Sequence, residues 1–246
     1  MKTINAHQQK YYEDVDKELS EHFLDMFSGI LEKVKKRETI KILDIGGGSG
    51  YFSNLVHEYF SDINCEIYVI DTTRYDTWTE LSDKITFIEG SAEDIDKLFE
   101  AETFDIVFAK FVFHHFVKNT WTGSVKCMKS VMPQIKTVLK KDSYLCMVEE
   151  LFDGFFGSTS ASRMIYFFTT VKIPFLARFF KNMGAQSAGV GVCFLSKKML
   201  YKLFKDSNLE IEESKETPVR EMKWYMHVGL LLKSYRHGCS FVAKKT

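Results

Sequence analysis

The feature that most constrains this chain is a glycine-rich loop between a short apolar segment and an amphipathic segment. Residues 40–45 are mostly apolar and lead directly into Gly-Gly-Gly-Ser-Gly at 46–50, after which apolar residues recur at helical spacing from Phe52 to Phe60. Glycines allow a sharp turn and a close backbone approach to a ligand, and free N–H groups collect where the following helix begins. The loop therefore predicts a nucleotide-like ligand at the carboxyl edge of a parallel sheet.

The rest of the chain continues this alternation of strand and helix patterns. Further strands are expected at 65–70 (ending at Asp71), 85–89, 104–109, 144–148, 209–213 and 239–243. Helices are expected at 8–36, 92–99, 120–140 and 196–207. The pattern predicts an α/β fold with a Rossmann-like, seven-stranded, mostly parallel sheet, helices on both faces, and a closing pair formed by the last two strands.

We expect a single domain over 1–246, with an N-terminal helical cap at 1–36. The rhythm breaks at 151–195, a segment rich in Phe, Gly, Ser and Thr, which we interpret as a helical lid inserted after the fifth strand. Its aromatic residues predict the wall of an apolar acceptor pocket or part of the core. A homodimer interface is a second interpretation, and contact of 163–180 with a membrane surface is a third.

Charge and cysteine content exclude several function classes. Lys plus Arg and Asp plus Glu both number 33, so the basic excess typical of phosphate-gripping proteins is missing and no nucleic-acid partner is expected. The five cysteines are widely spaced without a Cys-x-x-Cys pair, which favours neither disulfides nor a metal site. No secretory signal or transmembrane run is visible, and we expect a cytoplasmic protein.

The spacing within the loop separates the nucleotide-binding classes. A phosphate loop requires Gly-Lys followed by Ser or Thr, and no lysine follows this loop. The dinucleotide fingerprint Gly-x-Gly-x-x-Gly would need its third glycine at Tyr51 or Ser53. Both classes are disfavoured, although a nucleotide-cofactor oxidoreductase is kept as an alternative.

What is present is Asp44-x-Gly46-x-Gly48-x-Gly50, which resembles the first motif of class I S-adenosylmethionine-dependent methyltransferases. The resemblance extends to Asp71 at the end of the second strand, to 90–94 after the third and to 104–110. It implies S-adenosyl-L-methionine as cofactor and S-adenosyl-L-homocysteine as product, with Ser91 standing where the family commonly has Asp. The cofactor-binding residues implied are Tyr12, Asp44, Gly46, Gly47, Gly48, Gly50, Asp71, Thr72, Ser91, Ala92, Glu93 and Lys110.

Candidate acceptor residues follow the fourth and fifth strands. The resemblance places His114 and His115 beside the transferred methyl group, and a histidine can remove a proton from an acceptor near neutral pH. His115 is the first candidate base and His114 the second, with a packing role as the alternative. Glu149 and Glu150 end the expected fifth strand and either attract an amine or form salt bridges. No metal ligands are predicted.

The sequence therefore predicts methyl transfer to an oxygen or nitrogen of a small, hydrophobic or aromatic molecule. Base-modifying methyltransferases commonly carry Asn-Pro-Pro-Tyr after the fourth strand, and metal-dependent catechol enzymes carry an aspartate there; this chain has neither. The alternative is a non-catalytic module that binds S-adenosylmethionine and acts through the surface of 151–195.

Overall fold

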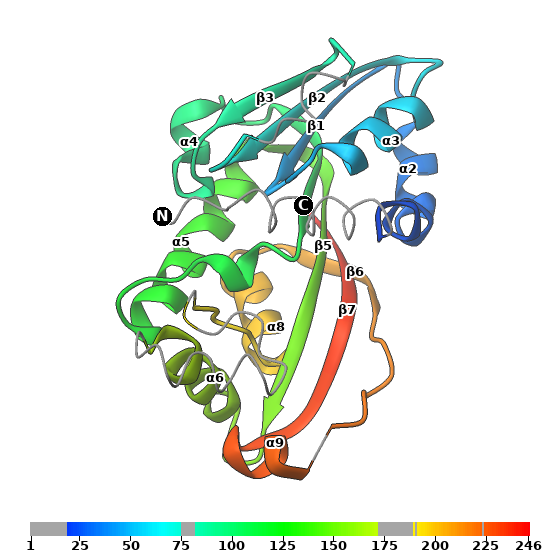
Figure 1. The fold of residues 1–246 in the computed structure, drawn as a ribbon. Helices are drawn as coiled ribbons and strands as arrows, with labels where there is room; N and C mark the ends of the chain where they lie inside the picture. Colours follow the sequence, from blue (N-terminus) through cyan, green and yellow to red (C-terminus); the bar gives the residue numbers. More distant parts are fainter. Residues whose placement is uncertain (1–18, 75–81, 172–188, 190, 223) are drawn as a thin grey trace. The chain divides into compact units, whose positions relative to one another are not determined.

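The computed structural model describes residues 19–74, 82–171, 189, 191–222 and 224–246. The chain divides into two compact units, which are treated separately here. Unit 1 comprises 1–110, 134–147 and 242–246, and unit 2 comprises 111–133 and 148–241. Within the described residues, the strands form one seven-stranded sheet in the order β3-β2-β1-β4-β5-β7-β6, which confirms the predicted Rossmann-like fold (Figure 1).

Unit 1 contains the parallel strands that carry the glycine loop. β1 (Thr39–Ile45) pairs in parallel with β2 (Asn64–Asp71) on one side and β4 (Phe104–Lys110) on the other, and β3 (Ile85–Glu89) pairs in parallel with β2. All seven residues of β4 are buried, as expected for a central strand of a parallel sheet. The carboxyl ends of these strands therefore share one edge of the sheet.

The helices of unit 1 pack on this sheet through apolar faces. Residues 19–26 are helical, and α2 (Ser28–Val34) begins after a break at Phe27, so the single helix expected over 8–36 is interrupted in its described part. α3 (Tyr51–Tyr59) begins directly after the glycine loop. Its Phe52 ring packs edge-on against Phe108 of β4, with ring centroids 5.0 Å apart. The helix expected at 92–99 is a 3-10 turn, η2 (Ala92–Asp94), followed by α4 (Ile95–Leu98).

β5 (Leu139–Gly154) and β7 (Leu232–Lys244) are much longer than the strands predicted at 144–148 and 239–243. α5 (Trp121–Val138) consequently ends before Lys140, which was expected to be helical. The fifth strand does not end at Glu149 and Glu150, because both lie inside β5. Backbone hydrogen bonds join Asp142 to Lys245 and Phe155 to Leu231, so the two strands run antiparallel.

Unit 2 contains the end of β5 (148–154) and the beginning of β7 (232–241), together with several helices. They are η3 (Phe113–His115), α6 (Ser160–Thr170), α8 (Lys197–Asp206) and α9 (Trp224–Gly229), with β6 (Glu210–Lys215) beside β7 as the predicted closing pair. Among the described residues, no helix is both long and apolar enough to cross a membrane.

The segment expected as a lid, 151–195, is mixed in character where it is described. Its first residues, 151–154, belong to β5, and α6 supplies Ala161 and Ile165 to an apolar cluster with Phe152. Phe155, Phe156 and Phe167 are instead exposed. Residues 172–188 and 190, which include Phe175, Phe179 and Phe180 of the expected lid, lie outside the described residues.

Candidate active site

The glycine loop of unit 1 has a backbone that other residues would not readily adopt. Gly46, Gly48 and Gly50 have φ angles of 68°, 55° and 78°, in the left-handed region that favours glycine. Gly47 is constrained by space instead, because a Cβ there would lie 2.4 Å from Cγ1 of Val69. The glycines are thus required for the turn itself. The turn ends at Tyr51, where α3 begins.

Asp71 joins this loop at the end of β2. Its Oδ2 accepts a hydrogen bond from the Gly48 N–H at 3.1 Å, and its Oδ1 accepts one from Thr73 at 3.1 Å. Burial raises the pKa of this carboxyl, although backbone N–H donors, including that of the exposed Thr72, counteract the shift. Each carboxylate oxygen keeps a further lone pair, so Asp71 can accept from a pair of adjacent hydroxyl groups.

Asp44 and Lys110 form a buried ion pair between neighbouring strands β1 and β4. Lys110 Nζ lies 2.7 Å from Asp44 Oδ1, and the Ser53 hydroxyl donates to Asp44 Oδ2 at 2.9 Å. The ammonium also lies 4.0 Å from the centroid of the Phe52 ring, a cation–π distance. The structure thus brings two predicted cofactor residues together and fixes the carboxyl ends of their strands.

The segment after β3 forms the remaining part of the predicted cofactor site. Ser91 caps the η2 turn by accepting a hydrogen bond from the Glu93 N–H at 3.2 Å. The side chain of Ala92, the residue between them in the sequence, is buried. The Ser91 hydroxyl proton is not used by this cap, so the side chain can still donate. Tyr12, the remaining predicted cofactor residue, lies outside the described residues.

The predicted acceptor residues belong to unit 2. His114 is buried, its Nδ1 lies 2.9 Å from Glu149 Oε2, and the other oxygen of Glu149 accepts from the Phe113 N–H at 2.7 Å. Burial alone would lower the pKa of His114, but the negative charge and hydrogen bond of Glu149, supported by Glu150, raise it above its ordinary value. The contact with Glu149 therefore favours the protonated form of His114.

His115 differs from its neighbour. The two rings lie 4.2 Å apart between centroids, and His115 is exposed while His114 is not. The pKa of His115 is lowered, first by desolvation from the surrounding protein and second by the positive charge of His114. The turn therefore places an exposed imidazole with a lowered pKa beside a buried one with a raised pKa.

Sequence reasoning missed three side chains of these sites, namely Ser53, Tyr235 and His237. Ser53 holds Asp44, and its place in the first turn after the loop was the available signal. Glu150 is bonded by His237 and by the Tyr235 hydroxyl, the latter at 2.9 Å, both from β7. The i, i+2 spacing of Tyr235 and His237 on one strand face was their only trace in the sequence.

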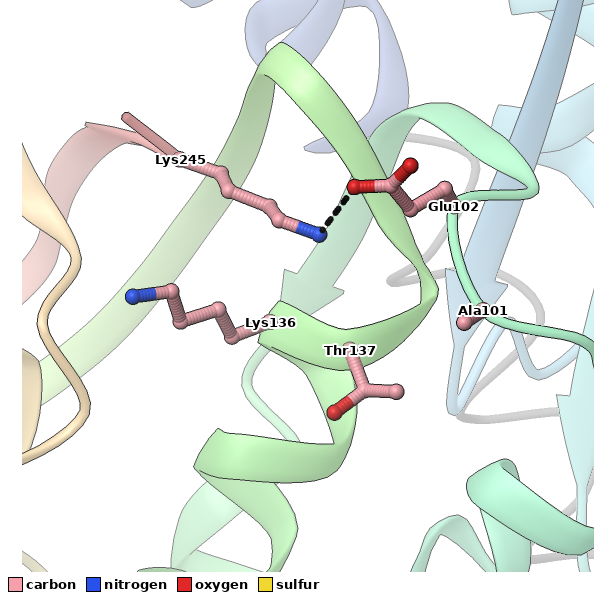
Figure 2. Close-up of a pocket in the computed structure, with 5 residues that line it drawn as sticks. All are labelled: Ala101, Glu102, Lys136, Thr137 and Lys245. Carbon is pink, nitrogen blue, oxygen red and sulfur yellow. Dashed lines mark hydrogen bonds and ion pairs between the residues drawn. The ribbon is translucent and has the colours of Figure 1, made fainter.

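The hollow in Figure 2 belongs to another part of unit 1. It has a volume of about 420 Å³ and is lined by Ala101, Glu102, Lys136, Thr137 and Lys245. Ala101 and Glu102 precede β4, whereas the glycine loop follows β1, and these two strands are parallel. The hollow is therefore at the amino edge of the sheet, opposite the edge where α/β sheets bind nucleotide-like ligands.

Comparison with known proteins agrees with this geometry. Residues 43–147, from β1 into β5, match the family model described as a methyltransferase domain. No curated protein matches the sequence.

Several solved structures share the fold at low sequence identity. An S-adenosylmethionine-dependent methyltransferase from Methanosarcina mazei is 19% identical, with 85% of this chain and 93% of that chain covered and a TM-score of 0.55. The 1,6-didemethyltoxoflavin-N1-methyltransferase of Burkholderia thailandensis, solved with its substrate and S-adenosylhomocysteine, is 13% identical over 100% and 93% (TM-score 0.54). Geranyl diphosphate C-methyltransferase from Streptomyces coelicolor is 8% identical over 89% and 80% (TM-score 0.53).

The family match begins next to Asp44 and includes the glycine loop, Asp71 and the turn at Ser91, which are the residues that the structure assembles at the carboxyl edge of the sheet. Residues 43–147 therefore match a methyltransferase domain, and the chain shares the fold of solved S-adenosylmethionine-dependent methyltransferases.

Proposed function

We propose that this protein transfers a methyl group from S-adenosyl-L-methionine to an oxygen or nitrogen of a small molecule. The observation that carries the proposal is the contact between the loop and Asp71, in which the Gly48 N–H is bonded to the carboxylate. Asp71 would accept the ribose hydroxyls, and Ser91, Ala92 and Glu93 would border the adenine. Glycines 46–50 would let the backbone approach the methionine portion closely.

Asp44 and Lys110 have an indirect role in this proposal. Asp44 Oδ1 is paired with Lys110, and its Oδ2 accepts a hydrogen bond from Ser53. Because both oxygens already have partners, Asp44 and Lys110 would mainly hold the loop in place and would contact the cofactor less directly. The proposed cofactor site also keeps Thr72, beside Asp71, and Tyr12, which would cover the methionine end from the N-terminal segment. S-adenosylmethionine supplies an activated sulfonium methyl group, so the protein must mainly align an acceptor opposite the sulfur.

The acceptor is proposed to be hydrophobic or aromatic. Unit 2 supports this with a partly buried aromatic cluster in which the Phe194 ring lies 4.4 Å from that of Phe152 and 4.7 Å from that of His114. His115 and His114 are the candidate proton acceptors. His115 suits the role by being exposed, but its lowered pKa makes it a weaker proton acceptor, and His114 would first have to release its ion pair with Glu149.

Calorimetry with S-adenosylhomocysteine tests the cofactor site. The Asp71→Ala variant removes the ribose acceptor, and we expect affinity to fall on the order of tenfold to a hundredfold, as for loss of about 1.5–3 kcal/mol of hydrogen bonding to a charged group. Asp62→Ala is the matched control, because Asp62 is an exposed aspartate of unit 1 paired with Lys35. Equal affinity of the two variants would contradict the assignment.

The second candidate function is a module that binds S-adenosylmethionine without transferring its methyl group and acts through the surface of 151–195. Exposed Phe155, Phe156 and Phe167 favour it, since such side chains are suited to contact with a partner or a second copy. Binding of S-adenosylhomocysteine without label transfer from tritiated S-adenosylmethionine to any pool of small molecules would support the module. A cytoplasmic location and the lid role of 151–195 remain part of the main proposal.

A further inference from the structure

Large apolar side chains are exposed at the end of unit 2 where β5 stops and β7 starts. Phe155 and Phe156 follow β5 directly and are 57% and 75% exposed, and Trp224 and Val228 of α9 are 75% and 67% exposed. Trp224 and Val228 are four residues apart, so they share one face of α9. We call these four residues the apolar end. Single exposed apolar residues are ordinary on a protein surface, but a group of them marks an interaction site.

Contacts within unit 2 hold the apolar end together. The Phe155 N–H donates to the Leu231 carbonyl at 3.0 Å, and the centroid of the Phe155 ring lies 6.4 Å from that of His227. His227 Nδ1 lies 2.8 Å from the carbonyl oxygen of Leu232, the first residue of β7. Leu230 packs against a buried apolar cluster of the same unit. These contacts join the end of β5, α9 and the start of β7 (Figure 1), so the four exposed side chains belong to one surface.

The charge of this surface is positive. Residues 154–171 and 224–235, which form the apolar end and the adjoining α6, contain Arg163 and Lys233 and no Asp or Glu. Both cations are exposed. The whole chain has equal numbers of acidic and basic residues, 33 of each, so the local excess does not follow from the composition.

The chemistry of this surface fits an anionic bilayer better than a second copy of the chain. Aromatic side chains are favoured at the boundary between lipid headgroups and acyl chains, and clustered cations are attracted to anionic headgroups. A two-fold dimer would use the same patch on both subunits, so Arg163 and Lys233 would meet a surface of their own sign. Asp153, at the border of the surface, is paired with Arg236 at 3.3 Å and does not reverse that sign.

We propose that the apolar end is a docking surface for an anionic lipid bilayer. The exposed rings would enter the region between headgroups and acyl chains, while Lys233 and Arg163 would lie at the level of the lipid phosphates. The protein then lies on the bilayer without crossing it. The inference is independent of the proposed methyl transfer, because none of these residues belongs to the proposed cofactor site.

The first test is sedimentation of the full-length protein with vesicles of phosphatidylcholine, either alone or with about 30% phosphatidylserine. We expect binding to be about 10- to 30-fold tighter on the anionic vesicles, as for two cations near a charged surface, and to weaken as salt is raised. Tryptophan emission should shift to shorter wavelength on anionic vesicles, and Trp224→Phe should lack that shift. Absence of binding to anionic vesicles, or equal binding to both kinds, overturns the proposal.

The second test compares substitutions at exposed positions. Phe156→Ser and Trp224→Ser should each lower the affinity for anionic vesicles by about tenfold or more, because each removes a large ring from the contact. Their control is Leu98→Ser, since Leu98 of α4 is 42% exposed and lies in unit 1. Lys233→Glu should weaken binding to anionic vesicles only, and Lys36→Glu, at an exposed position of unit 1, is its control.

Circular dichroism shows whether each variant is folded. Phe156 lies outside any helix or strand, so its variant keeps the test decisive if Trp224→Ser unfolds α9. Equal vesicle binding by Phe156→Ser and Leu98→Ser would refute the assignment of the surface. Analytical ultracentrifugation tests the other occupant: a wild-type dimer that Phe156→Ser dissociates, with no vesicle binding by the wild type, would assign the surface to a second copy and overturn the proposal.

Discussion

The buried ion pair of Asp44 and Lys110 gives the sharpest prediction for stability. Lys110→Met keeps an unbranched apolar side chain against Phe52 but leaves the Asp44 carboxylate, which is only 1% exposed, with the Ser53 hydroxyl as its remaining side-chain partner. Removing one member of a buried pair costs about 3–5 kcal/mol, because a charge is left without compensation. For a chain of this length that loss lowers Tm by roughly 6–20 °C.

Urea unfolding and thermal melts followed by circular dichroism measure this effect. The control is Lys41→Met, which breaks a pair with Glu66 whose side chains are 42% and 39% exposed and should cost less than about 1 kcal/mol. The double variant Asp44→Asn/Lys110→Met removes both charges and should recover most of the loss. A single Lys110→Met variant as stable as the control would refute the reasoning.

Two further predictions concern the loop and the buried histidine. Gly47→Ala should lower the free energy of unfolding by about 1–3 kcal/mol, because its Cβ would overlap Val69. Gly29→Ala is the control, because the space around Gly29 is open and the substitution should be neutral or stabilising. Equal effects of the two substitutions on urea unfolding would contradict the steric explanation. The raised pKa of His114 stabilises the folded state fully below the unfolded value of 6.5, so this contribution should fall as pH rises through the folded pKa. Urea unfolding across pH should show that decline relative to Glu149→Gln, and a difference that grows with pH would contradict the sign.

The first half of the fold could be predicted because each element there has a local signal. Short segments rich in apolar residues mark β1 to β4, and glycines with positive φ mark the turn after β1. The strand ends that carry Asp71 and Lys110 follow directly, so the cofactor residues could be listed from spacing and resemblance. The structure added the contacts between them, such as the bond from the Gly48 N–H to Asp71.

The second half was misjudged because its strands contain charged residues. Glu149, Glu150 and Asp153 interrupt the apolar run of β5, which made the strand look finished near Val148. In the structure each carboxylate has a cationic or histidine partner, and Arg236 of β7 lies 3.3 Å from Asp153. Glu149 and His114 lie 35 positions apart, and the other two pairs join residues more than eighty positions apart, so a single sequence carries no signal of them.

The same reason explains the missed histidine. His114 and His115 were found because they follow β4 in the sequence, whereas the pairing of His237 with Glu150 is seen only in the structure. The structure also distinguishes the two neighbouring histidines, because Glu149 raises the pKa of buried His114 and desolvation lowers that of His115.

A structure of the protein soaked with S-adenosylhomocysteine tests the central claim most directly. The account predicts ligand density along Gly46–Gly50, with the ribose hydroxyls on the Asp71 carboxylate and the adenine beside Ser91, Ala92 and Glu93. Density at any other place, such as the hollow beside Glu102 and Lys245, with the loop left empty, would contradict it.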